Sequence, residues 1–113
     1  MAAPAPQAKT LFRVPIPPYH SHPGGAIVCT EPSPAVYLLT FFSPPDNRLT
    51  RVSCDAFLEA LDLIEFGGYP PGVVVTTSAI PKFYSNGLDL ELAMAQKDFF
   101  PDKLYKLFRR FLT

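Results

Sequence analysis

Runs of apolar residues, separated by polar turn residues, predict three β-strands along this chain. Two runs rich in β-branched and aromatic residues, 26–30 and 35–42, flank a turn at 31–34 and favour a β-hairpin. A third run, 73–78, shows no polar alternation, which is typical of a strand covered on both faces. The expected order begins with two strands, and the third strand follows a helix.

A helical spacing of apolar residues predicts that helix over about 51–66. Thr50 is a suitable N-cap, and Gly67 and Gly68 are expected to end the helix. The acidic side chains Asp55, Glu59 and Asp62 are expected on its outer faces. Its apolar stripe consists of Phe57, Leu58, Leu61 and Ile64.

Two further helical segments are predicted after Gly87. Residues 88–96 are compatible with a helix, and the last helix is expected to begin near Pro101, since proline suits a first-turn position. Its spacing predicts an apolar stripe that few earlier elements are left to cover. That stripe consists of Leu104, Leu107, Phe108 and Phe111.

The first 25 residues lack apolar periodicity. Their prolines, together with Gly24 and Gly25, favour extended or irregular backbone and oppose a helix. We therefore expect a Pro-rich N-terminal arm over 1–25 and one domain over 26–113. The mixture of strands and helices in this domain predicts an α/β fold.

Composition excludes some classes of partner. The 113 residues are enough for one small domain, and the formal net charge of zero argues against a nucleic-acid partner. No stretch approaches the roughly 18 continuous apolar residues that a membrane span requires. Residues 1–7 lack the pattern of a signal peptide. A small basic face on the last helix is expected to be solvated; it consists of Lys103, Lys106, Arg109 and Arg110.

The cysteines and histidines do not predict a metal site. Cys29 and Cys54 lie far apart without metal-ligand spacing, so they are interpreted as reduced, partly buried thiols of an intracellular protein. His20 and His22 form an HxH pair, but a metal site needs three or four ligands and no partner set accompanies them. We interpret this pair as part of a solvated loop.

Two motifs at a characteristic spacing carry a family resemblance. One is Asn47-Arg48-Leu49 within SPPDNRLT, and the other is FYSNGLDLE, which follows the strand at 73–78. With the helix between them, they resemble the N-terminal half of the crotonase (enoyl-CoA hydratase/isomerase) superfamily over roughly residues 26–112. The pattern is closest to fungal enoyl-CoA isomerase/hydratase-like proteins. The resemblance implies the N-terminal part of a crotonase-type ββα spiral fold, held here in truncated form.

The resemblance also implies an acyl-CoA site built from these motifs. The backbone N–H of Leu88 would donate to the thioester oxygen as one half of an oxyanion hole and so stabilise an enolate. Gly87 would let the ligand approach closely. Acyl-CoA would be the substrate, and neither a cofactor nor a metal is implied. The implied substrate-binding residues are Arg48, Leu49, Ser85, Asn86, Gly87, Asp89 and Leu90.

The implied function is enoyl-CoA hydration or isomerisation in fatty-acid β-oxidation, with the Δ3,Δ2-enoyl-CoA isomerase type favoured. The resemblance suggests a peroxisomal or mitochondrial location, and trimers or hexamers only for full-length relatives. No acidic residue of this chain matches a catalytic carboxylate of the family, and the second oxyanion donor lies beyond the matched segment. The short chain is therefore expected to be inactive.

Other interpretations of the same residues stay open. The sequence Ser85-Asn86-Gly87 also fits an ordinary turn with glycine at positive φ. The chain could be a non-catalytic acyl-CoA-binding or interaction fragment that associates with full-length family members. It could also be an incomplete product that cannot fill its own core.

Overall fold

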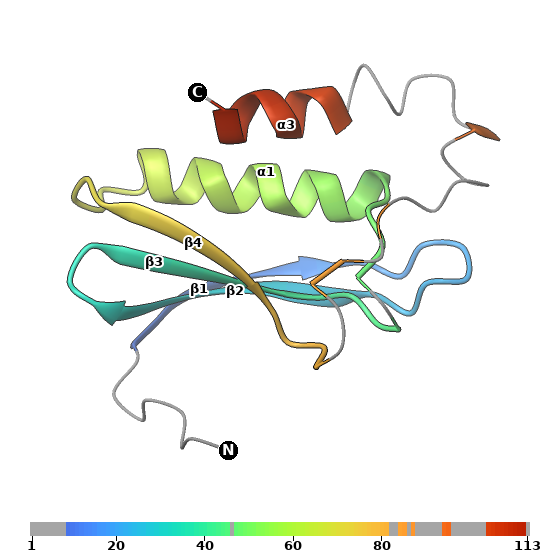
Figure 1. The fold of residues 1–113 in the computed structure, drawn as a ribbon, viewed down its shortest axis with the longest axis horizontal. Helices are drawn as coiled ribbons and strands as arrows, with labels where there is room; N and C mark the ends of the chain where they lie inside the picture. The colour runs from blue at the N-terminus through green and yellow to red at the C-terminus, as the bar shows by residue number, and fades with distance from the viewer. Residues whose placement is uncertain are drawn as a thin grey trace.

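In the part of the chain that the structure describes, four strands form a single sheet (Figure 1). The computed structural model describes residues 9–45, 47–81, 84, 85, 87, 94, 95 and 104–112. Strands lie in the order β1-β2-β3-β4; β1 pairs with β2 and β2 with β3 in antiparallel fashion, whereas β3 and β4 are parallel. The elements are β1 (Lys9–Ile16), β2 (Gly25–Ser33), β3 (Val36–Phe42), α1 (Arg51–Phe66), β4 (Val73–Ser78) and α3 (Tyr105–Leu112).

The α/β prediction is confirmed as a mixed four-stranded sheet with α1 packed on it. Helix α1 connects β3 to β4, because two parallel neighbours need a crossover that returns the chain to the same end. The predicted hairpin is also confirmed, since β2 and β3 pair antiparallel around a tight turn. Among the described residues, no helix is both long and apolar enough to cross a membrane.

One face of the sheet forms the core together with α1. Tyr37, Leu39 and Phe41 alternate along β3 and are fully buried, and the Phe41 ring meets Phe57 of α1 edge-on at 4.8 Å between centroids. Cys29 and Cys54 are buried in the same cluster and are not joined by a disulfide. Burial, reinforced by the carboxylate of Glu31, raises the pKa of the Cys29 thiol to about 11. The cysteines are therefore core side chains.

Helix α1 begins and ends where the sequence predicts. The Thr50 hydroxyl accepts the Ser53 N–H, and the Ser53 hydroxyl accepts the Thr50 N–H at 2.7 Å, which makes a reciprocal capping box. The C-cap is Gly67. On the sheet side of the helix, the buried side chains are those of Ser53, Cys54, Ala56, Phe57, Ala60 and Leu61.

The first 25 residues were expected to be extended or irregular; Lys9–Ile16 are extended, but as strand β1 at one edge of the sheet, which the sequence did not predict. Val14 and Ile16 are buried in the core, whereas Arg13 and Pro15, which alternate with them, are exposed. This two-residue alternation is a strand signal that the prolines obscured. Pro15 is tolerated because an edge strand needs hydrogen bonds on one side only.

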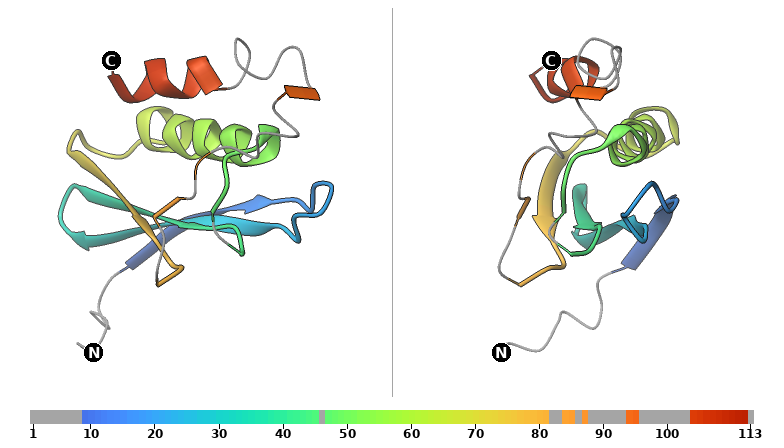
Figure 2. Two further views of the ribbon diagram at one scale, coloured as in Figure 1. Left: turned by 45° about the vertical axis from the view of Figure 1, so that its right-hand side comes forward. Right: turned by 90° about the vertical axis from the view of Figure 1, so that its right-hand side faces the viewer.

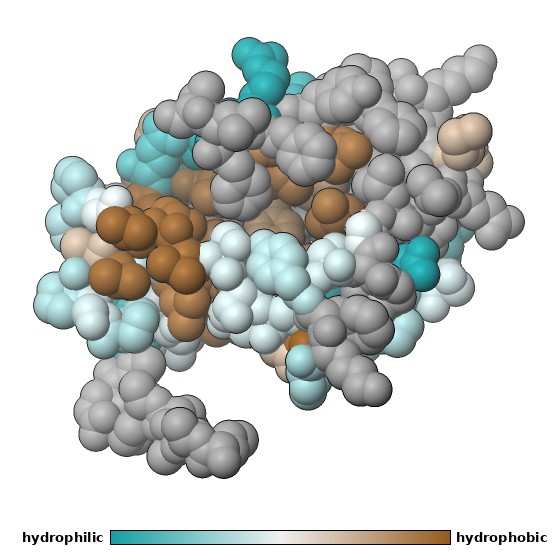
Figure 3. Space-filling view, viewed as in Figure 1, coloured by the Kyte–Doolittle hydropathy of each residue, from teal (hydrophilic) through white to brown (hydrophobic). Residues whose placement is uncertain are grey.

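The expectation that β4 is covered on both faces is also wrong. β4 is the other edge of the sheet, and Val73, Val74 and Val75 are 59%, 39% and 42% exposed. Apolar surface gathers over the first half of β4 (Figure 3). A run of β-branched residues indicates a buried strand only when neighbours cover both of its sides, and here one side is free.

Helix α3 packs beside α1, farther from the sheet than α1 and displaced toward its β4 side (Figure 2). Leu104 and Leu107 are buried in the same cluster as Phe57 and Leu61. The expectation that few elements remain to cover this stripe is therefore wrong for Leu104 and Leu107, which pack in the core cluster with α1. The side chains of Phe108 and Phe111 lie outside the described part of the chain, as do most of residues 88–96.

Candidate functional site

Two loops meet at one end of the parallel strand pair. The first follows β3 and runs to Thr50, and the second follows β4 and includes Ser85 and Gly87. Because β3 and β4 run in the same direction, the loops at their carboxyl ends emerge at the same edge of the sheet. The two sequence motifs lie in these loops, one in each.

Asn47 holds the two loops together. Its side chain is 0% exposed. The Asn47 Oδ1 accepts the Ser43 N–H at 2.7 Å, within its own loop. The Asn47 Nδ2 donates to the Ser78 hydroxyl at 2.7 Å and to the Tyr84 carbonyl at 2.9 Å, both on the other side of the junction. A longer contact of 3.3 Å runs from Nδ2 to the Phe41 carbonyl.

The backbone of Asn47 extends the same junction. Its N–H donates to the Ser43 carbonyl at 2.8 Å, and its carbonyl accepts the Ser85 hydroxyl at 2.6 Å. Asn47 has a φ of 54°, in the left-handed region that asparagine tolerates better than most residues. A buried amide with partners on both loops fixes their relative position more firmly than apolar contact would.

The structure brings together several residues that the resemblance implies. The Leu49 N–H donates to the Gly87 carbonyl at 2.7 Å, and the Gly87 N–H donates to the Ser85 hydroxyl at 3.1 Å. Gly87 has a φ of 81°, and no described heavy atom lies within 4 Å of the place a Cβ would occupy. The backbone at Gly87 would thus be strained for other residues, and the described atoms leave that side unfilled.

The remaining predicted site residues divide into two groups. Arg48 and Leu49 are half-buried in the first loop, and Leu49 packs against the core. Asn86, Leu88, Asp89 and Leu90 lie outside the described residues, so the predicted oxyanion donor is not placed. Asn47 was part of the recognised motif but was not among the predicted site residues. Its burial depends on contacts with residues 31 to 37 positions away, which no local pattern reveals.

Comparison with known proteins adds no assignment. No protein-family model, curated protein or solved structure matches the chain. The fold class is therefore stated from the structure alone, and any relation to the crotonase superfamily is a proposal.

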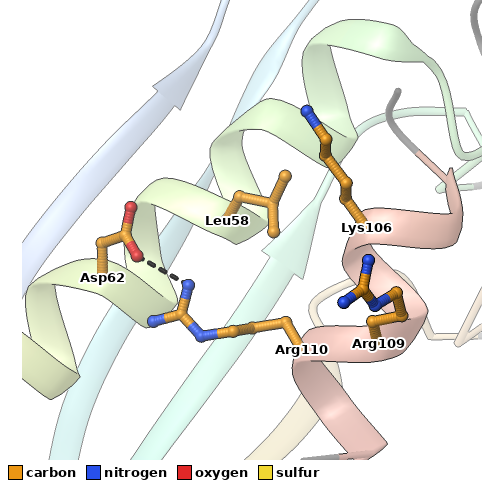
Figure 4. Close-up of a pocket in the computed structure, with 5 residues that line it drawn as sticks. All are labelled: Leu58, Asp62, Lys106, Arg109 and Arg110. Atoms are coloured by element: carbon orange, nitrogen blue, oxygen red, sulfur yellow. Dashed lines mark hydrogen bonds and ion pairs between the residues drawn. The ribbon is translucent and has the colours of Figure 1, made fainter. Parts of the chain in front are cut away.

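A pocket lies between α1 and α3 (Figure 4). It has a volume of about 380 Å³ and is lined by Leu58 and Asp62 of α1 and by Lys106, Arg109 and Arg110 of α3. Arg110 donates to Asp62 at 2.6 Å and to Glu65 at 2.7 Å. These contacts, led by the hydrogen bond with Asp62, raise the pKa of Arg110.

The expectation of a solvated basic face is therefore wrong for Arg110, which joins α3 to α1. Two acidic side chains neutralise this guanidinium, and both are more than half exposed. The arrangement is a surface ion-pair bridge between helices, which contributes modestly to stability. Among the described residues, no group of three or more His, Cys, Asp or Glu side chains is placed to hold a metal ion.

Proposed function

We propose that the paired loops bind the thioester of an acyl-CoA and polarise its carbonyl, as an enoyl-CoA hydratase/isomerase-type site would. The observation that carries the proposal is the junction at Asn47. Two motifs about 40 residues apart in sequence are joined there by hydrogen bonds through Asn47 and between Leu49 and Gly87. An ordinary turn accounts for glycine at positive φ, but it does not require a partner loop.

The chemistry of the proposal is carbonyl polarisation. A backbone N–H aimed at a thioester oxygen stabilises the negative charge that develops when a proton leaves the adjacent carbon, and one such donor is worth about 10²–10³ in rate. In the proposal, Leu88 supplies this N–H and the open side of Gly87 admits the thioester. Isomerisation of a 3-enoyl to a 2-enoyl thioester also needs a carboxylate to move the proton, and we assign that role to no residue of this chain.

The test is titration of the protein with octanoyl-CoA that carries a ¹³C label at the thioester carbonyl. We expect saturable binding by calorimetry and a shift of the carbonyl infrared band to lower frequency, because a hydrogen bond weakens the C=O bond. Octanoate alone is the ligand control. We expect no conversion of a 3-enoyl-CoA by the 113-residue chain.

Two substitutions at one position separate the backbone donor from the side chain. Leu88→Pro removes the N–H and should abolish the infrared shift, whereas Leu88→Ala keeps the N–H and should retain it. Arg48→Ala should weaken binding about 5–10-fold if it meets a CoA phosphate, with the shift preserved. A folded wild-type chain that does not bind millimolar octanoyl-CoA would overturn the proposal.

A second candidate is a non-catalytic interaction fragment that associates with full-length family members. The observation that favours it is the exposed valine run of β4, since exposed apolar surface promotes association. The same titration distinguishes the candidates. Binding without the infrared shift favours a non-catalytic acyl-CoA-binding fragment, and absence of binding leaves only the interaction role.

A further inference from the structure

The outer side of β4 presents backbone groups that can pair with another strand. The Val73 N–H donates to the Ala35 carbonyl, and the Ala79 N–H donates to the Phe41 carbonyl. In a parallel ladder, alternate residues face the neighbour, so Val73 and Val75 bond to β3. The N–H and C=O of Val74, between them, therefore point away from the sheet.

The two edges of this sheet differ sharply. β1 carries the exposed residues Lys9, Arg13 and Pro15, and its pairing register shifts between Thr10 and Phe12. Charges, proline and bulges of this kind prevent edge-to-edge association of sheets. β4 has none of them, because its sequence is VVVTTS. An exposed, uncharged edge with β-branched side chains is the usual form of an edge that another strand covers.

The exposure of β4 is confined to its first half. Val73, Val74 and Val75 are exposed, whereas Thr76 receives a hydrogen bond of 2.8 Å from the Tyr84 hydroxyl. Figure 3 shows the same division, with apolar surface over the part of β4 that lies nearest its start. A covering strand therefore has room beside Val73–Val75 and little beyond Thr76.

We propose that β4 pairs antiparallel with β4 of a second copy of this chain, which joins two sheets into one of eight strands. A two-fold axis through such a pair places one residue opposite its own copy. Val74 fits that position because both of its backbone groups point outward. Val73 then lies opposite Val75 of the second copy, and Gly72 lies opposite Thr76.

A second copy of this chain suits the β4 edge, because self-pairing places residues of the same strand, VVVTTS, opposite one another. A charged residue in β4 would oppose a like charge, but the strand contains none, and opposed β-branched side chains stabilise antiparallel pairs. The protected β1 edge stops further addition, so the assembly closes at two copies. Few residues pair, so we expect a weak dimer with a Kd on the order of 10–100 µM.

The test is sedimentation velocity of the full chain from about 5 to 500 µM, with three variants. Val74→Lys places like charges opposite each other, and Val74→Pro removes the outward N–H without removing a bond to β3. Thr10→Lys adds the same charge at the other edge and is the matched control. We expect wild-type and Thr10→Lys to dimerise, and both Val74 variants to need at least tenfold higher concentration.

Circular dichroism melts establish that each variant is folded before it is compared. A wild-type chain that stays monomeric at 500 µM would overturn the proposal. So would a dimer that both folded Val74 variants form as readily as wild-type, or one that Thr10→Lys alone disrupts. Growth into larger assemblies would also contradict it, because antiparallel pairing of β4 uses the one unprotected edge of the sheet that the described residues form, and stops at two.

Discussion

Asn47 shows how one buried amide can position two loops. Its side chain satisfies a donor in the loop after β3 and acceptors on both sides of the junction, and water cannot replace these bonds because the site is closed. Removing one partner of a buried hydrogen bond leaves the other unsatisfied, which costs about 1–3 kcal/mol per group. The relative position of the two loops of the candidate site therefore depends largely on Asn47.

We predict that Asn47→Ala lowers the free energy of unfolding by about 2–4 kcal/mol, because it leaves the Ser43 N–H and the acceptors on the second loop without hydrogen-bond partners. The measurement is equilibrium urea denaturation. Ser85→Ala, which removes one hydroxyl bond to the Asn47 carbonyl, should cost about 0.5–1.5 kcal/mol. Equal effects of the two substitutions would show that Asn47 has no special role at the junction.

Asn47→Asp tests the same amide through pH. The new carboxylate would face acceptors where Nδ2 now donates, so the fold would favour the protonated form and raise the pKa of that carboxyl above its unfolded value. A raised pKa in the folded state means that stability is greatest below the unfolded pKa, near 4, and falls as pH increases. The variant should be more stable relative to wild-type at pH 4 than at pH 7.

The sequence could not identify this role for Asn47. Asp-Asn after two prolines is typical of a turn, and a turn gives no reason to bury the Asn47 side chain. Asn47 connects the two loops because its side chain donates to Ser78 and to Tyr84. These residues lie within its reach because β3 and β4 pair in parallel register. The resemblance located the two motifs, and only the three-dimensional arrangement indicated which side chain connects them.

At the scale of the elements, α3 is held on α1 by apolar burial and by one ion-pair bridge. Leu107 is 2% exposed, whereas the carboxylates that bind Arg110 are more than half exposed. Removing apolar atoms from a buried site costs their transfer energy and leaves a cavity. Exposed ion pairs contribute little, because solvent screens them and long side chains lose entropy when they pair.

We therefore predict that Leu107→Ala lowers the free energy of unfolding by about 2–4 kcal/mol, and that Arg110→Ala lowers it by at most about 1 kcal/mol. Urea denaturation at low and high salt measures both, and the Arg110 effect should shrink at high salt. Lys106→Ala, at an exposed site on the same helix, is the control and should change stability by under about 0.5 kcal/mol. An Arg110 effect larger than that of Leu107 would contradict this order.

Most elements could be predicted because their signals are local. Thr50, the apolar spacing and Gly67 define α1 without reference to the rest of the chain. The errors concern neighbouring strands: β1 was missed because its proline is tolerated only at a sheet edge, and β4 was expected to be covered because valine runs usually are. Position within a sheet depends on strand order, which hydrophobic pattern alone does not determine.

At the scale of the whole molecule, the sheet is asymmetric. Its β1 edge is protected by charge and proline, and its β4 edge is open at the end that lies away from the paired loops. The candidate site and the open edge share β4 but occupy opposite ends of it (Figure 1). Ligand binding at the loops and pairing along Val73–Val75 can therefore occur together without competing for the same residues.

Amide hydrogen exchange, measured residue by residue by NMR, tests this arrangement in the intact chain. At about 5 µM we predict that the Val73 and Val75 amides exchange slowly, because they donate to β3, and that the Val74 amide between them exchanges quickly. At about 500 µM the Val74 amide should slow at least tenfold as β4 pairs with a second copy, while Val73 and Val75 change little. If Val74 is already as protected as its neighbours at 5 µM, the edge is covered within a single chain. In that case both the unpaired outer side of β4 and the proposed pairing with a second copy would be contradicted.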